Sequence, residues 1–452
     1  MGRRQCRACL SALCLVLAVS SRVAAQGYGV YEQSACAMAR GGAAVAAPCD
    51  DGSAIYFNPA AIAIQRDGSM LSGGATLIGP RGDFAGFGGR LNGTMKENWL
   101  PVPSAYYTTP VGDRLALGIG VFVPYGLTIE WPLDFAGRFV SYKTVLQAPY
   151  LQPTIAYKVN DHVFVGGGPD FVFSNLELNQ RVDLATQQLA PGITFAQIGV
   201  PPGTDFANVK ISGSDFGLAG HVGILIKADE KLSIGARYLS RHTISRQDLA
   251  FASEQIPTGL RTPIPLPGIP AGTPIDTLLA PQFAAGGRLS NQSARTELTV
   301  PDQFVAGVAI MPIAQLKLLV DYQFTTWSVF EGLEFTTDRG LTELIVKNYR
   351  DTSGVRIGVD YGVTDRVALR GGFVTHQAAA PDGSVTPDLP EGARREYTAG
   401  LGARFSRRLG VDIAYQYIDQ EDRNGRVLLT GPDTGTYAFH ANLFGATVTV
   451  RF

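Results

Sequence analysis

The stretch "LKLLVDYQFTTW" at positions 316–327 decides the fold, because its side chains alternate strictly between apolar and polar. A period of two residues is typical of a β-strand with one apolar and one polar face. The apolar row is Leu316, Leu318, Val320, Tyr322 and Phe324, and the polar row is Lys317, Asp321, Gln323 and Thr325. The segment therefore predicts a strand that lies between an apolar and a polar environment.

The same alternation recurs along the chain, for example at 232–238, 355–361 and 411–417, and predicts an all-β protein. A soluble sandwich would also give this pattern, with its apolar face inward. The connections favour a transmembrane barrel, because short turns alternate with long loops and the short turns of such barrels are periplasmic. The short turns are 110–114, 159–162, 227–231, 363–366 and 405–410, and the long loops lie near 80–100, 124–143, 179–212, 251–293, 336–350, 377–394 and 422–435.

The segments between these connections predict about fourteen antiparallel strands, an even number as bacterial barrels require. The final stretch, "FHANLFGATVTVRF" (439–452), reads as the closing strand. Its outward row would be Phe444, Ala446, Val448, Val450 and Phe452, with Thr447, Thr449 and Arg451 inward. A closing strand that ends on an aromatic residue is commonly bound by the outer-membrane assembly machinery, so Phe452 predicts that machinery as a partner.

The N-terminus divides into two parts. Residues 1–25 have a basic start, a short apolar core and small residues before Gln26, which together indicate a secretory signal peptide. Residues 26–68 are too apolar for a solvated linker, and a barrel of this size has a lumen too wide for its own side chains to fill. We therefore assign 26–68 to a hatch that plugs the lumen and 69–452 to the barrel, in the outer membrane of a Gram-negative bacterium.

Composition and motifs exclude several functions. The formal net charge of -1 argues against a nucleic-acid partner. The five histidines are scattered without metal-ligand spacing, and no phosphate-binding or GxSxG motif occurs, so we predict no metal, no cofactor and no enzyme. A barrel hydrolase, which would need a His/Ser pair, stays open as an alternative. Cys36 and Cys49, which follow the predicted signal peptide, either form a disulfide or are two small buried residues.

Several segments resemble one known family, the FadL-like outer-membrane transporters of long-chain fatty acids and hydrocarbons. The stretch from Gly27 to Ala63 is similar to the family's hatch, with an Asn-Pro-Ala motif at Asn58, Pro59 and Ala60. The segments 320–335, 348–363 and 441–452 resemble its later strands. The resemblance implies passive inward transport of hydrophobic molecules by a monomer surrounded by outer-membrane lipid, with a general diffusion porin as the alternative.

The resemblance also implies a route. Ligand would enter an external apolar groove, pass to an inner pocket and leave sideways through a kink in the third strand. The apolar loops 181–211 and 251–291 are candidates for the groove, although their side chains can equally pack on each other to cap the barrel. The ligand-binding candidates in these loops are Phe195, Ile198, Phe206, Leu266, Leu278 and Phe283.

Two further sets of residues follow from the resemblance. Pro124 and Gly126 in the third strand can interrupt pairing and open the wall, or can simply mark the strand's end beside a loop. Tyr56 and Phe57, together with Asn58, Pro59 and Ala60, are assigned to hatch gating, with a plain turn as the alternative reading.

The family's inner pocket binds the ligand carboxylate through basic residues, and Arg350 is the best match here. Arg350 can equally be a rim charge that pairs with Asp351. A second basic residue is not evident, since Asn175 and Glu177 stand in the corresponding strand. The choice between a fatty acid and an uncharged hydrocarbon therefore stays open. The other inward charges, among them Asp321, Asp360, Arg370 and Asp412, are expected to form ion pairs around the hatch.

Overall fold

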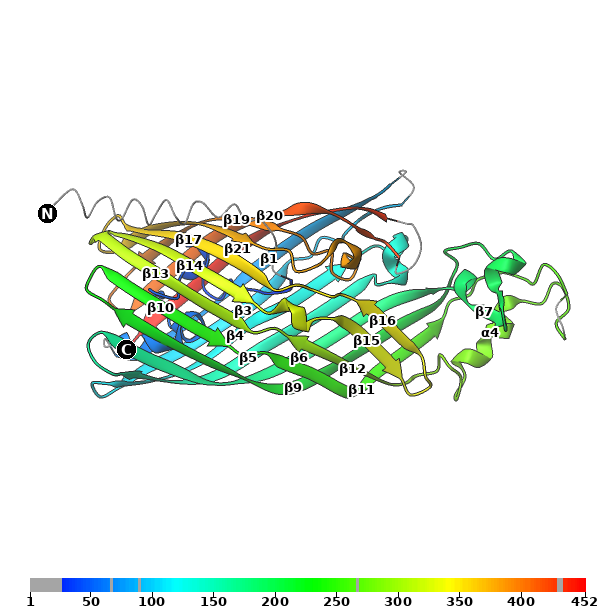
Figure 1. Cartoon of the computed structure of the whole chain (residues 1–452), viewed down its shortest axis with the longest axis horizontal. Coiled ribbons are helices and arrows are strands. Elements are labelled where there is room, and N and C mark those ends of the chain that lie inside the picture. Colours follow the sequence, from blue (N-terminus) through cyan, green and yellow to red (C-terminus); the bar gives the residue numbers. More distant parts are fainter. Residues whose placement is uncertain (1–26, 66–67, 88–90, 266–267, 429–433) are drawn as a thin grey trace.

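The computed structural model describes residues 27–65, 68–87, 91–265, 268–428 and 434–452. The predicted signal peptide, residues 1–25, lies outside the described residues. The chain forms a closed antiparallel barrel of fourteen strands (Figure 1), as the sequence predicted. The barrel closes because the first strand pairs with the last along seventeen residues, from Met70 against Arg451 to Gly86 against Gly435.

Ten of the spanning strands are continuous and four are interrupted once. The continuous strands are β1 (Met70–Gly86), β3 (Leu100–Val111), β4 (Leu115–Glu130), β5 (Lys143–Lys158), β6 (Val163–Asp183), β9 (Asp205–Lys227), β18 (Val367–His376), β19 (Arg394–Arg404), β20 (Leu409–Arg426) and β21 (Thr434–Arg451). The interrupted strands are β10 with β11 (Leu232–Leu239, His242–Gln255), β12 with β13 (Gln292–Val300, Gln303–Ile313), β14 with β15 (Leu316–Thr325, Gly332–Thr337) and β16 with β17 (Thr342–Val346, Thr352–Gly362).

Smaller elements lie in the loops and inside the barrel. They are α2 (Ala35–Met38), α3 (Ala54–Phe57), β2 (Asn92–Thr94), β7 (Gln188–Ala190), β8 (Ile193–Thr194) and α4 (Ile275–Phe283), with the 3-10 helices η1 (Pro59–Ile64), η2 (Ala136–Phe139), η3 (Leu184–Thr186), η4 (Phe195–Ile198), η5 (Trp327–Val329) and η6 (Asp382–Ser384). No helix of the described ranges is long and apolar enough to cross a membrane.

The apolar row of β14 faces outward. Leu318, Val320 and Tyr322 are 39%, 42% and 46% exposed, whereas Asp321 and Gln323 on the opposite face are each 1% exposed. A soluble sandwich would bury the first row and expose the second. The apolar belt therefore contacts lipid, and the polar row faces the lumen.

The connections differ between the two ends of the barrel. Figure 1 shows short turns at one end and the long loops with β7 and α4 at the other. This asymmetry confirms that the short turns and the long loops lie at opposite ends of the barrel. That the short turns are periplasmic stays a prediction.

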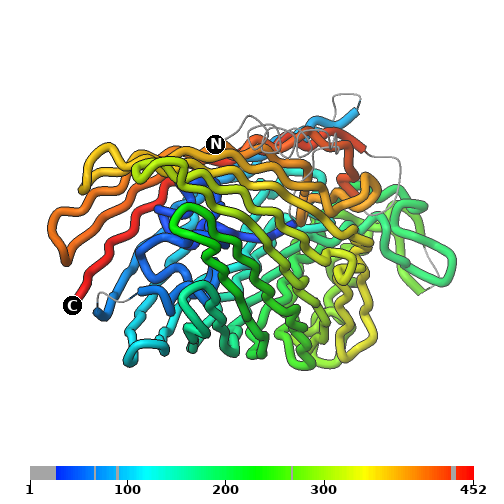
Figure 2. Tube along the Cα trace, turned by 60° about the vertical axis from the view of Figure 1, so that its left-hand side comes forward, coloured from blue at the N-terminus to red at the C-terminus, as the bar shows by residue number. Residues whose placement is uncertain are grey.

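Residues 27–65, here called the N-terminal segment, lie inside the barrel toward the short turns (Figures 1 and 2). Cys36 and Cys49 form a disulfide within it, which decides between the two alternatives left open by the sequence. Two glycines of the wall let the segment approach closely. A side chain at Gly166 would lie 2.7 Å from the Pro59 carbonyl, and one at Gly223 would overlap the Asn58 amide.

Charged side chains of the wall bind residues 40–45 of this segment, as expected from the sequence. The carboxylate of Asp321 accepts hydrogen bonds from the backbone N–H groups of Ala44 (2.7 Å) and Val45 (2.9 Å). Asp360 forms ion pairs with Arg40 of the segment (3.6 Å) and with Arg370 (3.1 Å), and Arg370 also pairs with Asp412. Because these groups are removed from water, their mutual pairing is what makes their burial tolerable.

Candidate functional site

The wall of the barrel is interrupted beside its third strand. β3 pairs with β4 only between Ala105–Val111 and Leu115–Val121 in the part of the chain that the structure describes. Beyond that point, β4 continues to pair with β5 as far as Glu130, and β3 continues to pair with β1 as far as Leu100. The two strands have therefore separated, which leaves a gap in the wall.

Pro124 and Gly126 lie at this gap. The register between β4 and β5 shifts between Phe122 and Tyr125, which marks a bulge around Pro124. The sequence suggested a position beside a loop, and this was wrong, because β4 runs six residues past Pro124 to Glu130. A proline within a strand removes one ladder donor, and a bulge accommodates that loss.

The free edge of β4 is partly covered from inside by the N-terminal segment. Val30 donates its N–H to the Pro124 carbonyl (2.9 Å), and Gly126 donates to the Tyr28 carbonyl (3.0 Å). The Gln33 amide bonds both the N–H (3.0 Å) and the carbonyl (2.7 Å) of Val123. On the opposite edge of the gap, Pro101 and Pro103 of β3 have no N–H that would need a partner.

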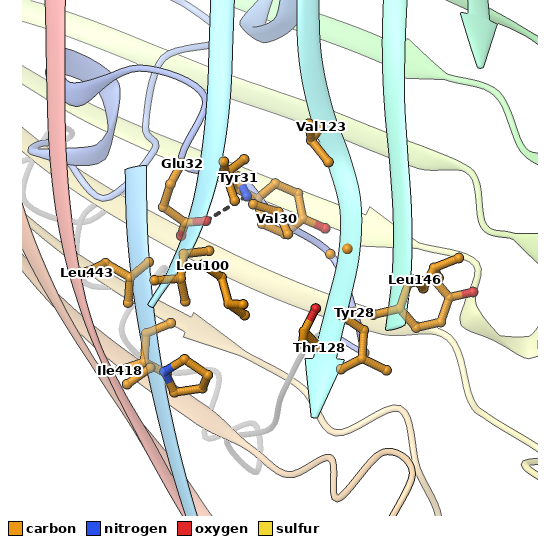
Figure 3. A pocket seen from close by; sticks show the side chains of 18 of the residues that line it. Tyr28, Val30, Tyr31, Glu32, Leu100, Val123, Thr128, Leu146, Ile418 and Leu443 are labelled. Atoms are coloured by element: carbon orange, nitrogen blue, oxygen red, sulfur yellow. Dashed lines mark hydrogen bonds between the residues drawn. The ribbon is translucent and has the colours of Figure 1, made fainter. Parts of the chain in front are cut away.

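A cavity of about 380 Å³ lies between the gap and the N-terminal segment (Figure 3). Its wall is mainly apolar and comes from β1, β3, β4, β5, β19, β20, β21 and residues 27–32 and 389–391. Figure 3 labels several of its side chains, among them Val30, Leu100, Val123, Leu146, Ile418 and Leu443. A concave apolar site with few polar groups is the usual form of a small-molecule site.

Four charged residues interrupt this apolar wall, namely Glu32, Glu391, Arg394 and Glu396. Glu391 accepts hydrogen bonds from the N–H groups of Gly27 (3.1 Å), Ala379 (3.1 Å) and Ala380 (2.8 Å). Burial raises the pKa of the Glu391 carboxyl, and these hydrogen bonds oppose that rise. Arg394 donates to the Gly27 carbonyl (3.2 Å), so both side chains fix the start of the N-terminal segment at the cavity.

A second cavity, of about 170 Å³, lies among the long loops. Phe206, which the sequence selected, lines it together with Ile211, Phe251 and Phe335. Phe283 contacts the Phe206 ring edge-on, with the ring centroids 6.2 Å apart. Phe206 and Phe283 are therefore brought together at this cavity.

The remaining loop candidates are placed differently. Phe195 and Ile198 of η4 are buried in the apolar core, and Leu278 of α4 is half-buried. Leu266 lies outside the described residues. Loop packing, which the sequence left as one of two readings, thus accounts for the positions of Phe195 and Ile198.

Arg350 does not lie on the wall of the 380 Å³ cavity. It is exposed in the link between β16 and β17, where its backbone N–H donates to Ala379 (2.9 Å), and its neighbour Asp351 accepts from the Ser328 N–H (2.9 Å). The basic residue on the cavity wall is Arg394, which was not among the residues predicted from the sequence. The available signal was its position at the start of a strand, directly after the long loop 377–394.

The Asn-Pro-Ala motif fixes the N-terminal segment to the wall away from this cavity. Asn58 is fully buried, and its amide donates to the carbonyls of Val45 (2.7 Å) and Ile224 (2.9 Å) and accepts from Ala60 (3.2 Å). Pro59 starts η1, where its missing N–H costs nothing.

The aromatic neighbours of this motif are buried beside it. Phe57 is 2% exposed, and its ring contacts that of Tyr56 edge-on with the centroids 4.9 Å apart. The guanidinium of Arg237 lies 4.6 Å from the centre of the Tyr56 ring.

Only one group of metal-ligand residue types is found in the described ranges. It consists of Cys36, Cys49 and Asp51, and its two sulfur atoms are joined in the disulfide.

Residues 16–452 match the model of the family of outer membrane protein transport proteins (OMPP1/FadL/TodX). The chain belongs to this family. The resemblance seen in the N-terminal segment and the later strands is thereby confirmed, as is the location in the outer membrane.

The named relatives agree with this assignment. The chain is 24% identical to the long-chain fatty acid transport protein of Salmonella typhi, over 90% of this chain and 91% of that protein. The crystal structure of a FadL homologue from Pseudomonas aeruginosa has a TM-score of 0.81 at 20% identity, covering 94% of this chain and all of that one. The toluene transporter TbuX of Ralstonia pickettii has a TM-score of 0.66 at 19% identity, covering 94% of this chain and all of that one.

Proposed function

We propose that this outer-membrane transport protein carries hydrophobic small molecules passively inward, taking them up at the 170 Å³ cavity and holding them in the 380 Å³ cavity. From there the ligand leaves sideways through the gap between β3 and β4. The single observation that supports this route most directly is that the larger apolar cavity lies at that gap, lined by Gly126 and Leu127 from one edge and by Leu100 and Val102 from the other.

The relatives support the substrate class. One transports long-chain fatty acids and another toluene, so this family architecture serves ligands with and without a charged head group. We assign residues 26–68 to the hatch and 1–25 to a signal peptide. The barrel is expected to reach the membrane through the assembly machinery and to act as a monomer.

A bulky side chain in the cavity tests the route. Gly126 lines the cavity, and a Cβ there would meet only ordinary contacts at 3.7 Å, from the Val30 side chain and the Leu146 carbonyl. Gly126→Trp should therefore fill the cavity and lower uptake of a labelled hydrophobic ligand by at least about tenfold. Gly371→Trp is the control, because Gly371 shares the outward face of β18 with Leu369, which is 51% exposed.

The same proteins distinguish the alternatives. A diffusion porin would give large, stable ion currents in a planar bilayer, whereas a plugged barrel should conduct little. Equal uptake by wild type and Gly126→Trp would contradict the proposed route. Turnover of a lipid or peptide substrate that a single Ser or His substitution abolishes would instead indicate a hydrolase.

A further inference from the structure

Two carboxylates on the cavity wall share one amide. Gln416 of β20 donates through its side-chain nitrogen to Glu32 of the N-terminal segment (2.8 Å) and to Glu396 of β19 (2.8 Å). Both glutamates line the 380 Å³ cavity. Within the described part of the chain, the second Glu32 oxygen accepts only the adjacent Tyr31 N–H (2.9 Å), and Figure 3 shows Glu32 directed toward the apolar side chains.

Two basic groups lie nearby, and Arg394 is hydrogen-bonded, whereas the Nη2 atom of Arg356 has no hydrogen-bond partner among the described residues. Arg394 donates to the carbonyl of Gly27 (3.2 Å) and to Gln420 (3.4 Å). The guanidinium of Arg356 on β17 lies 4.2 Å from the centre of the Tyr31 ring, and this side chain is 2% exposed. Arg356 thus contacts the Tyr31 ring. It does not line the 380 Å³ cavity but a separate one of about 10 Å³, together with Glu32, Glu396 and Gln416.

The charges around this end of the cavity do not balance. The N-terminal segment contributes Glu32, the loop before β19 contributes Glu391, and β19 contributes Glu396 and Arg394. β17 adds Arg356, and β18 adds His376, whose ring stacks on Tyr31. Three carboxylates therefore stand against two guanidinium groups. A ligand carboxylate would add a fourth acid in a poorly solvated site, where repulsion between like charges is strong.

Resting on the function proposed above, we infer that Glu32, Gln416 and Glu396 determine the head group that the cavity takes. The group accepts a neutral amphiphile whose hydroxyl donates a hydrogen bond to a glutamate oxygen, and it rejects an ionised carboxylate. The apolar remainder of the cavity holds the hydrocarbon chain in either case. Apolar contacts are the same for both kinds of ligand and cannot distinguish them. Discrimination between a neutral and an ionised ligand therefore arises at the head group.

Two ligands that differ only in their head groups test this inference. Dodecanol and dodecanoate are titrated into the purified full-length protein in a non-ionic detergent at about pH 8, where a carboxyl is ionised. Dodecanol should bind at least about tenfold more tightly, because only dodecanoate meets the acidic excess. Dodecanoate binding as tightly as dodecanol would overturn the inference.

Variants that remove a charge test whether Glu32 and Glu396 cause the preference for dodecanol over dodecanoate. Glu32→Gln and the double variant Glu32→Gln/Glu396→Gln keep the side-chain shape, and the double variant should bring the two affinities to within about threefold. Glu97→Gln is the matched control, since it removes one charge from an exposed pair with Arg81 on the outer surface. If the double variant fails to fold, as heat-modifiable migration would reveal, the single Glu32→Gln variant decides, with a smaller shift in the same direction.

The outcomes separate this inference from the proposed function. If both ligands bind equally and Gly126→Trp abolishes both, the route stands and the head-group inference is wrong. If neither ligand binds wild type, the proposed function itself fails. An unchanged affinity ratio in Glu32→Gln and in the double variant would also overturn the role of this group.

Discussion

The backbone N–H of Val30 lies 2.9 Å from the carbonyl oxygen of Pro124, and this hydrogen bond joins the N-terminal segment to the bulge of β4. Pro124 is at the gap in the wall, and Val30 lines the cavity behind it. Movement of the segment therefore changes the cavity and its opening together. The contact is also exchangeable, because both groups belong to the backbone and either can bond water instead.

Gln33→Ala should loosen this connection. The Gln33 amide makes three hydrogen bonds, to the Val30 carbonyl (3.1 Å) and to both backbone groups of Val123, so its loss should weaken the local contact by about 1–3 kcal/mol. Hydrogen exchange at the Val30 and Gly126 amides should become faster than in wild type. Gln377→Ala, on the far wall, should leave both amides unchanged, and equal protection in all three proteins would refute the coupling.

Asn58→Ala should detach the N-terminal segment from the β9 wall. It leaves the buried carbonyl of Val45 and the partly buried carbonyl of Ile224 without the amide donor, at about 1–3 kcal/mol for a buried unsatisfied group. Asn58→Asp keeps the size but directs a carboxylate at the same two carbonyls, so it should lower the thermal transition at least as far. If the Asn58→Asp protein were as stable as wild type, side-chain volume and not hydrogen bonding would be what matters at this position.

Loss of the disulfide should loosen the same segment without unfolding the barrel. Cys36 and Cys49 are separated by 13 positions, and closing a loop of that size contributes about 2–4 kcal/mol. In the Cys36→Ser/Cys49→Ser variant, protease cleavage within residues 27–65 should become faster than in the wild type. Heat-modifiable migration of the barrel should stay the same, and a barrel that no longer folds would contradict this separation.

Arg350→Ala should change the binding of dodecanoate by less than about twofold, because the side chain is exposed and lies off the cavity wall. Arg394→Met keeps the length of the stem but removes the donor to Gly27, and it should change binding of both ligands by disturbing the start of the segment. A large, carboxylate-specific loss in Arg350→Ala would restore the role that the sequence assigned to it.

The mature protein should begin at Gln26 if residues 1–25 are a signal peptide. The intact mass of protein purified from outer membranes measures this directly. A mass that includes Met1 would contradict the assignment.

Local pattern accounts for the part of this protein that could be predicted. Whether Leu318 or Asp321 faces lipid depends on alternation along one strand, and the position of the long loops follows from the spacing of such strands. The residue types of the Asn58-Pro59 pair likewise predict a local turn. From these features the barrel, the separation of its short turns from its long loops, and its family could be predicted.

The cavity could not be predicted from local pattern. The gap at Pro124 depends on where β3 and β4 stop pairing, and Glu32 meets Gln416 across 384 positions of sequence. Arg350 and Arg394 are both arginines near loops, and only the assembled barrel leaves Arg350 exposed in a link between strands and places Arg394, at the start of β19, on the cavity wall. Alternation is a property of neighbouring residues and can be read along the chain, whereas a binding site is made by side chains that only closure of the barrel brings together.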